Sequence, residues 1–497
     1  MASDYKNITW DPEFDVVIGL EIHSQLATNT KIFCGCPAKG SDKTNANTCP
    51  VCAGHPGTLP VLNKKVVEYA IRAGLALDCK IQKHNVFSRK NYFYPDLPKG
   101  YQISQFDKPI CEHGKVEIEF KDASGKEVTK TIGITRIHME EDAGKNVHLE
   151  DFSLVNLNRA CVPLIEIVSE PDMRSPEEAG AYMRLIHSIV TAIGVCDGNM
   201  QEGNFRCDAN VSVMRKDATK FGTRAEIKNV NSFKFVEKAI EFEINRQIGV
   251  VKSGGTIVQE TRLYDSEKNV TISMRSKEEA HDYRYFPEPD LIPVRLTDAW
   301  IDRVKLEMPE LPRQKRERYV KEYALSPYDA GVITASSGIA AAFDAAVTLA
   351  TSKGFTKIQL AKPISNLITG EIARLLKESS IEFSDSKIKA QHLVDVATLT
   401  FNNTISSTGA KAAIAVAWNT GDAIDAIVEK EGLKQVSDTG ALEKAIDQVI
   451  AANPGQVAEF KSGKDKLMGF FVGQAMKATG GKANPGMLQE ILKKKLS

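Results

Sequence analysis

An unusual row of polar side chains lies near the start of the chain, in the stretch VIGLEIHSQL. Apolar and polar residues alternate here, which is typical of a β-strand and places Glu21, His23 and Gln25 on one face. A carboxylate and an imidazole side by side can ligate a metal ion or transfer protons. These polar residues form either the solvent-exposed face of a half-buried strand or one wall of a reaction site, and the pattern fits both.

Two further segments supply carboxylates on predicted strands. The segment ITRIHMEEDAGK places His138, Glu140 and Glu141 near a strand end, and VPLIEIVSEPD puts Glu166 in the middle of an apolar strand. A buried glutamate is costly unless it is paired or bound to a metal, although Glu166 also fits the wet side of a half-exposed strand. Together with the first strand, these residues suggest Mg²⁺, which prefers oxygen ligands and is usually shared with substrate phosphates. The chemistry that this favours is phosphoryl transfer.

Positive charges are interleaved with tyrosines in the segment FSRKNYFYPDLPKGYQISQ. Its Pro and Gly residues predict a loop. Cations and aromatic rings together suit a clamp for a nucleotide or an acceptor stem, and an ordered surface loop has the same composition. The residues concerned are Arg89, Lys90, Tyr92, Tyr94, Lys99 and Tyr101.

A further strand pattern, EGNFRCDANVSV, puts Arg206 and Asp208 on one almost purely polar face. The next predicted strand, which contains Glu226 and Lys228, alternates in the same way. Two such neighbouring faces form either the floor of a polar cavity or a solvated outer face. The sequence contains neither a Walker A loop nor a Gly-x-Gly-x-x-Gly loop, so an ATP site here is of an unconventional type.

Four of the nine cysteines form two close pairs, Cys34-Gly-Cys36 and Cys49-Pro-Val-Cys52, with twelve residues between the pairs. Zinc takes four soft ligands at the corners of a tetrahedron, and two such pairs supply them around one loop. Four sulfur ligands close the coordination shell, so we expect a structural zinc site over residues 34–52. Four unconnected free thiols are the alternative.

The bulk composition is that of an ordinary globular protein of 497 residues, in which 64 Lys plus Arg balance 64 Asp plus Glu. A nucleic-acid partner is therefore not indicated by net charge and has to be sought in local patches. One such patch is the last segment, residues 461–497, which has eight Lys against two acidic residues. The N-terminus has no apolar leader and no segment is apolar enough to span a membrane, so we expect a cytoplasmic protein without a membrane partner.

The pattern changes along the chain in a way that predicts an α+β fold. Residues 1–293 have short alternating segments with Gly and Pro, which indicates a mostly antiparallel β-sheet with inserted helices, including one over 63–77. Residues 294–405 and 406–497 are helical. A chain of this length is too long for one core, and we expect three domains.

The motifs, taken together, resemble one family, GatB, the B subunits of tRNA-dependent amidotransferases. Seven segments carry the resemblance in the family's order and over nearly the whole chain: VIGLEIHSQL, RKNYFYPDLPKGYQISQ, ITRIHMEEDAGK, LNRACVPLIEIVSEPD, EGNFRCDANVSV, HDYRYFPEPDLIP and MGFFVGQAMKATGGKANP. The resemblance implies a catalytic cradle domain (1–293), a helical domain (294–405) and a YqeY-like tail (406–497) that touches the tRNA. It also implies two partners, GatA and GatC, in a GatCAB heterotrimer.

The activity implied by the resemblance is a carbon–nitrogen ligase reaction with glutamine as amido donor. With ATP and Mg²⁺, GatB phosphorylates the side-chain carboxylate of Glu-tRNA(Gln), Asp-tRNA(Asn) or both. Ammonia that GatA releases from glutamine then displaces the phosphate.

The resemblance gives the catalytic site six residues: Glu21, His23, Lys90, Glu140, Glu141 and Glu166. Of these, His23, Glu141 and Glu166 match the Mg²⁺ positions, whereas Lys90 and Glu140 match polar positions where the ammonia tunnel meets the synthetic site. The alternation of side chains along the strand is compatible with either Glu140 or Glu141 as the metal ligand, so the choice of Glu141 rests on the family pattern. Substrate or ATP contacts are expected from Arg89, Tyr92, Tyr94, Lys99, Tyr101, Arg206 and Asp208, and tRNA contacts from Lys477 and Lys482. The cysteines Cys34, Cys36, Cys49 and Cys52 match a zinc site that part of the family keeps.

Two other functions fit the same residues. A non-catalytic tRNA-binding scaffold would use the zinc loop and the Lys-rich tail, and it would bind tRNA without ATP turnover. A stand-alone ATP-dependent ligase for a small carboxylate would need no partner, but the sequence shows no glutaminase nucleophile motif, so ammonia must come from elsewhere. Which aminoacyl-tRNA is the substrate depends on the host's synthetases and on tRNA features.

Overall fold

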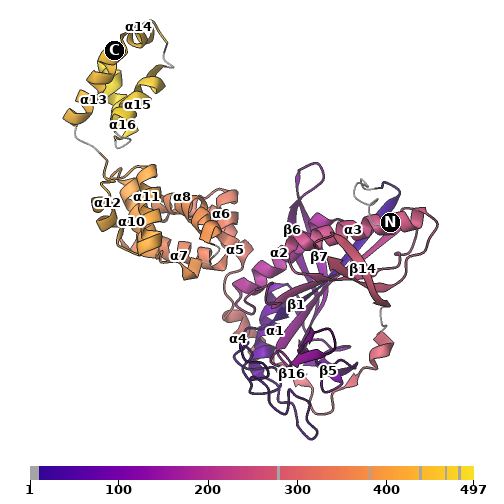
Figure 1. The fold of residues 1–497 in the computed structure, drawn as a ribbon. Helices are drawn as coiled ribbons and strands as arrows, with labels where there is room; N and C mark the ends of the chain where they lie inside the picture. Colours follow the sequence, from indigo (N-terminus) through magenta and orange to yellow (C-terminus); the bar gives the residue numbers. More distant parts are fainter. Residues whose placement is uncertain are drawn as a thin grey trace. The chain divides into compact units, whose positions relative to one another are not determined.

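The computed structural model divides into two compact units, Met1–Leu311 and Pro312–Ser497. It describes residues 11–276, 280–379, 381, 383–435, 439–464, 467–479 and 483–496. The first unit is built on a large sheet, and the second unit is helical (Figure 1). The α+β class expected from the alternation of patterns is confirmed.

A nine-stranded sheet forms the first unit, in the order β14-β13-β12-β11-β1-β10-β7-β6-β2. All neighbours pair antiparallel except β12 and β13, which are parallel. The strands are β1 (Phe14–Gln25), β2 (Lys80–Ile81), β6 (Cys111–Lys121), β7 (Glu127–Glu141), β10 (Pro163–Ser169), β11 (Phe205–Arg215), β12 (Ala225–Val230), β13 (Glu260–Asp265) and β14 (Val270–Ser276). The first strand lies near the middle of the sheet, so its polar row has neighbours on both sides.

Three helices pack on one face of this sheet: α1 (Lys64–Ala76), α2 (Pro176–Ala192) and α3 (Phe233–Lys252). The apolar residues of β1, among them Ile18 and Ile22, are buried in the core together with residues of these helices. Because side chains alternate along a strand, the polar residues of β1 must point to the opposite face. The helices thus decide which face of the sheet can carry a site.

Shorter strands complete the first unit. A three-stranded sheet has the order β15-β4-β5, and two-stranded sheets form from β16 with β3 and from β8 with β9. These strands are β3 (His84–Asn85), β4 (Ser88–Asn91), β5 (Tyr101–Ser104), β8 (Lys145–His148), β9 (Ser153–Asn156), β15 (Phe286–Pro287) and β16 (Val294–Arg295). A short 3-10 helix, η1 (Ala280–Tyr283), precedes β15, and helix α4 (Asp298–Leu306) packs on α1. The compact unit therefore extends beyond residue 293, where we expected the first domain to end.

The second unit has two separate hydrophobic cores, one over residues 319–428 and one over residues 442–496. Its elements are α5 (Pro312–Tyr323), α6 (Pro327–Thr334), α7 (Ser337–Ser352), α8 (Lys357–Leu367), η2 (Ile368–Ile372), α9 (Ala373–Ser379), η3 (Phe383–Asp385), α10 (Ala390–Phe401), α11 (Ser407–Thr420), α12 (Ile424–Lys430), α13 (Thr439–Ala452), α14 (Pro454–Lys461), α15 (Leu467–Ala478) and α16 (Pro485–Leu496). Among the described residues, no single helix is long and apolar enough to cross a membrane, and α6 with α7 reaches that length and hydropathy only as a pair bent by 116°. The division into a helical domain and a tail remains our proposal.

Candidate functional site

A cluster of two histidines and two glutamates lies on the face of the large sheet opposite the three helices, and three of its four residues are buried. Three neighbouring strands supply it: β1 places His23 opposite Glu166 of β10, and β10 places Glu166 opposite His138 of β7. The Glu166 carboxylate lies 3.4 Å from Nε2 of each histidine. The Glu140 carboxylate lies 3.9 Å from His23 Nε2 and 3.8 Å from His138 Nε2. The structure thus brings together two of the residues expected to bind Mg²⁺, His23 and Glu166, but with Glu140 as the third.

The charges in this cluster depend strongly on each other. Burial disfavours the charged imidazolium of His23, but the adjacent Glu166 carboxylate outweighs this and raises the pKa of His23 to about 9. Burial likewise disfavours the Glu166 carboxylate, and His138 and His23 hold its pKa well below its ordinary value. Without a cation, the two carboxylates therefore rely on protonated histidines. Ligand atoms of His23, Glu140 and Glu166 lie within 4.8 Å of one another, so one ion fits between them.

Glu141, expected as a metal ligand, is not in this cluster. Alternation along β7 puts Glu140 on the face of His138 and Glu141 on the opposite face. There the Glu141 carboxylate pairs with the ammonium of Lys99 and accepts hydrogen bonds from the backbone N–H of Ile103 (2.8 Å) and the thiol of Cys161 (2.7 Å). The set His23, Glu141 and Glu166 is therefore not the set that the fold assembles, and Lys99 is occupied by Glu141.

The polar face continues from the cluster along β1 and β11. Glu21 lies opposite Asp208 and His23 opposite Arg206 in the antiparallel register. Asp208 is paired with Lys228, whose Nζ lies 2.6 Å from Oδ2. Beside Glu21, residues of β1, β10 and β11 line a cavity with Phe221 and Arg224 at its margin. The alternating pattern of β11 thus forms part of a cavity floor.

Arg206 has an intramolecular partner on this face. Its guanidinium lies 3.1 Å from the buried carboxylate of Asp142, which also accepts a hydrogen bond from Gln25 (2.8 Å). Asp142 thereby ties the end of β7 to β1 and β11. Arg206, which we expected to contact substrate, is therefore already engaged in an ion pair within the chain.

The loop that we expected to clamp a ligand is ordered largely by its own ion pairs. Arg89 makes a bidentate ion pair with Glu288 (2.8 and 2.9 Å) and lies over the ring of Tyr101 at 4.2 Å. Lys90 differs, because no hydrogen bond or ion pair of its ammonium is found within the described part of the chain. It lies over Tyr283 instead, with Nζ 4.8 Å from the ring centroid.

The strand that carries Lys90 lies against the end of β7, because Lys90 pairs with Gln102 of β5 and the Gln102 amide donates to the backbone oxygen of Glu141 at 2.6 Å. Burial disfavours its ammonium, but Tyr285, Glu140 and Glu166 raise its pKa above the ordinary value. Lys90 is therefore a firmly charged cation near the acidic residues. Of the cations expected in the clamp, it is the one best placed to meet an anionic ligand.

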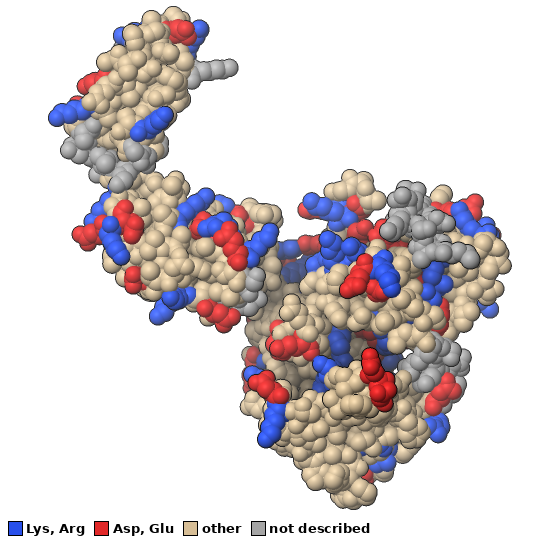
Figure 2. Space-filling view, in the orientation of Figure 1, with Lys and Arg blue, Asp and Glu red and all other residues tan. Residues whose placement is uncertain are grey.

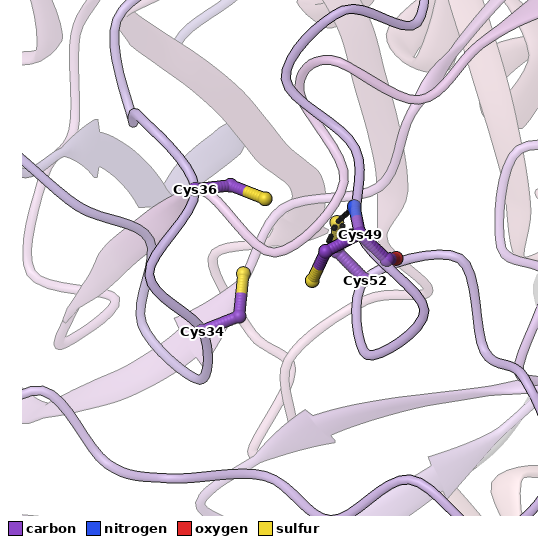
Figure 3. Close-up of side chains that lie close together, drawn as sticks. All are labelled: Cys34, Cys36, Cys49 and Cys52. Carbon is purple, nitrogen blue, oxygen red and sulfur yellow. Dashed lines mark hydrogen bonds between the residues drawn. The ribbon is translucent and has the colours of Figure 1, made fainter.

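The four paired cysteines converge as their spacing predicts (Figure 3). Their sulfur atoms lie within 4.8 Å of one another, with Cys49 and Cys52 at 3.8 Å. The backbone N–H of Cys49 and the ammonium of the buried Lys31 both donate to the Cys52 sulfur, at 3.1 and 3.6 Å. Donors of this kind stabilise a thiolate, so the residues fit a metal held by four sulfur ligands.

Some site residues were not assigned from the sequence. His138 stands two residues before Glu140 on the same strand, so the two side chains share one face. This spacing could have assigned His138 to the site, but the sequence did not show which face of the strand points to it. Tyr283 and Tyr285 lie within the motif HDYRYFPEPDLIP, which contributed to the family resemblance but was given no role in the site. In the tail, Lys477 lies in the last turn of α15, whereas Lys482 is outside the described residues.

These features define a protein with a His–Glu cluster and a four-cysteine cluster on a mostly antiparallel sheet domain, followed by helices. Residues 16–302 match the family of GatB/GatE catalytic domains, and residues 352–496 match the GatB domain.

Relatives of similar length share most of the sequence. The chain is 56% identical over 489 residues to the B subunit of the aspartyl/glutamyl-tRNA(Asn/Gln) amidotransferase of Geotalea daltonii, covering 97% of this chain and 99% of the relative. It is 54% identical over 487 residues to the corresponding protein of Halorhodospira halophila, with 97% and 99% covered. The chain belongs to the GatB family.

Proposed function

We propose that this chain is the GatB component of a tRNA-dependent amidotransferase that activates a carboxylate by phosphorylation. The γ-phosphate of ATP is transferred to the side-chain carboxylate of Glu-tRNA(Gln) or Asp-tRNA(Asn), which gives an acyl phosphate and ADP. Ammonia then attacks the acyl carbon, the C–O bond to phosphate breaks, and the amide and inorganic phosphate are released. The observation that carries this proposal is the His–Glu cluster on a sheet within the residues that match the GatB/GatE catalytic domain.

His23, Glu140 and Glu166 would hold the Mg²⁺ ion, and the donor set fits a divalent cation. Two carboxylates and a neutral imidazole leave positions for water and phosphate oxygens, which is how Mg²⁺ is usually shared. Bound there, Mg²⁺ would neutralise phosphate charge during transfer. Around it, Lys90 supplies a second positive charge, since its ammonium lies over Tyr283 and has no ion-pair partner among the described residues. The cavity beside Glu21 offers space for the nucleoside of ATP.

The remaining assignments follow from the same proposal. In this proposal the amidase GatA supplies ammonia and GatC completes a heterotrimer, as the resemblance implies, and the naming of the relatives as B subunits supports a complex of several subunits. The four cysteines hold a structural zinc ion, and the tail with Lys477 contacts the tRNA. None of the nine cysteines, all of which lie in the described part of the chain, forms a disulfide, which suits the reducing cytoplasm.

Two matched substitutions test the activity and its ligand set. In the reconstituted complex with aminoacylated tRNA and ATP, acyl phosphate can be trapped with hydroxylamine and quantified. We expect Glu140→Gln to reduce trapped product by roughly 100-fold or more, because an anionic ligand is lost from the phosphate site. Glu141→Gln keeps an acceptor for the Ile103 N–H and should retain most activation, with an unchanged Mg²⁺ requirement.

The controls separate this function from its alternative. Glutamine hydrolysis by GatA should partly survive in both variants, which shows that the complex is assembled. Equal loss from both substitutions, or a loss from Glu141→Gln alone, would contradict the ligand set. A wild-type complex that binds charged tRNA without any ATP turnover would instead favour the non-catalytic scaffold.

A further inference from the structure

Five aromatic rings form a continuous row on the first unit. In order they are Tyr94, Tyr92, Tyr283, Tyr285 and Phe106, and we call them the aromatic row. The first three steps have ring centroids 6.0 Å apart, and the last pair is stacked face to face at 4.1 Å with planes 6° apart. The row joins two segments that are far apart in the sequence, around β4–β5 and around η1–β15.

The row is held in place by specific contacts between these segments. Strand β15 pairs with β4, and the side-chain amide of Asn91 donates to the backbone oxygens of Tyr283 (3.1 Å) and Arg284 (2.8 Å). Arg284, between the two tyrosines, has a φ of 46°, a left-handed conformation that costs free energy in a residue with a Cβ. Such strain persists only where the surrounding contacts hold the backbone in place. The arrangement of the rings is therefore specified by the fold.

One part of the row lies beside the His–Glu cluster. The Lys90 ammonium lies 4.8 Å from the Tyr283 ring centroid and 5.9 Å from that of Tyr92. Lys90 pairs with Gln102 of β5, and Ser104 of the same strand donates to the Glu140 carboxylate at 3.4 Å. From there the row leads to solvent, since 43% of Phe106 and 45% of Tyr94 are exposed.

These features point to nucleobases as the ligand. Aromatic rings that are exposed at both ends of a row, with a cation at its half-buried middle, suit single-stranded nucleic acid, because every base has a face that stacks and every linkage carries a negative charge. A purely apolar peptide would not need the ammonium of Lys90 or the tyrosine hydroxyls. The proposed function gives the base of ATP a separate space, the cavity beside Glu21.

We propose that the aromatic row stacks the unpaired nucleotides at the 3′ end of the tRNA and so guides the aminoacyl group to the cluster. The inference rests on the proposed function, and it adds a binding site for one part of the substrate. Stacking on the row fixes the position of the last bases, while Lys90 faces the anionic groups between them and the cluster.

The test uses RNA binding without chemistry. The probes are an acceptor-stem minihelix that ends in its unpaired 3′ nucleotides and the same minihelix without them, both titrated into the assembled complex in the absence of ATP. We expect Tyr285→Ala and Phe106→Ala to weaken binding of the first RNA by about 5- to 100-fold and to leave the second unchanged, because a stacking contact is lost. Tyr285→Phe, which keeps the ring, should bind like the wild type and shows that the site can fold without the hydroxyl.

A matched control and two outcomes complete the experiment. Phe152→Ala removes another exposed aromatic ring, between β8 and β9, and should change neither affinity. Equal effects of Tyr285→Ala on both RNAs would overturn the inference, as would weaker binding of an ATP analogue with unchanged RNA affinity, which would assign the row to ATP. Row-dependent binding of the first RNA by a complex that never forms acyl phosphate would uphold the row and refute the activity.

Discussion

At the scale of single residues, the cluster shows how the surroundings of a side chain set its charge. His23 and His138 face the same two carboxylates, and His138 is buried whereas His23 is half-buried. Protonated histidines and bound Mg²⁺ are alternative ways to neutralise these carboxylates. Proton binding and metal binding at this cluster must therefore compete.

This competition predicts a pH-dependent stability for the metal-free protein. The pKa of His23 is about 9 in the fold, above its ordinary value, so the protonated histidine stabilises the fold fully below about pH 6.5. That contribution, on the order of 2–3 kcal/mol, is lost as the pH rises towards 9. Without Mg²⁺, we expect the midpoint temperature of the first thermal unfolding transition to fall as the pH rises over this range. The decrease should be smaller in the His23→Gln variant.

Calorimetry or dichroism at a series of pH values measures this, with saturating Mg²⁺ as the control. Mg²⁺ takes the place of the proton and should flatten the dependence. A metal-free wild type whose transition is constant from pH 6.5 to 9 would contradict the coupling.

At the scale of elements, the loop of the four paired cysteines packs closely against the segment that carries Lys99. Gly54, just after the second cysteine pair, has a φ of 69°, and a Cβ there would lie 2.8 Å from Cγ of Lys99. Only glycine lets the loop approach so closely. The loop thus supports Lys99 and, through it, Glu141.

We predict that Cys52→Ser removes the zinc ion and loosens this loop. The zinc content found by metal analysis should fall from about one ion per chain to almost none, because a serine oxygen is a poor replacement for a thiolate. Residues 34–52 should become sensitive to protease. Cys196→Ser is the control, since the hydrogen bonds of Cys196 with the Gly198 N–H and the Asn204 oxygen can also be made by a hydroxyl. Full zinc content in Cys52→Ser would refute the four-sulfur site.

At the scale of the whole molecule, neither positive nor negative charge dominates the surface. Basic and acidic side chains are interspersed on the visible face, and some Lys and Arg side chains lie in a hollow of the first unit (Figure 2). The proposed RNA binding would therefore rest on local groups, such as the lysines at the end of α15 and α16.

The tail lysines give a prediction for RNA binding. We expect Lys477→Ala and Lys494→Ala to weaken tRNA binding and to reduce the slope of log K against log salt by roughly one for each lost phosphate contact. Lys495→Ala should have the smaller effect, because its ammonium is paired with Asp447 at 2.6 Å. Titrations at several salt concentrations measure the slope, and identical slopes in all variants would exclude phosphate contacts by these lysines.

The sequence by itself determined what is local. The spacing of the cysteines predicted their convergence, and the alternation around His23 predicted a strand with one polar face. The change from strand to helix patterns predicted the α+β fold. These properties depend on neighbours along the chain, so they can be read from it.

Only the tertiary structure decided which side chains meet. Glu140 and Glu141 are both buried, so hydropathy could not assign their faces, and the choice depends on which face of the sheet the helices cover. The same holds for Lys99, which an acidic partner on another strand occupies, and for Tyr283, which meets Tyr92 from a distant part of the chain. Contacts between distant segments follow from strand register and helix packing, and no local pattern contains that information.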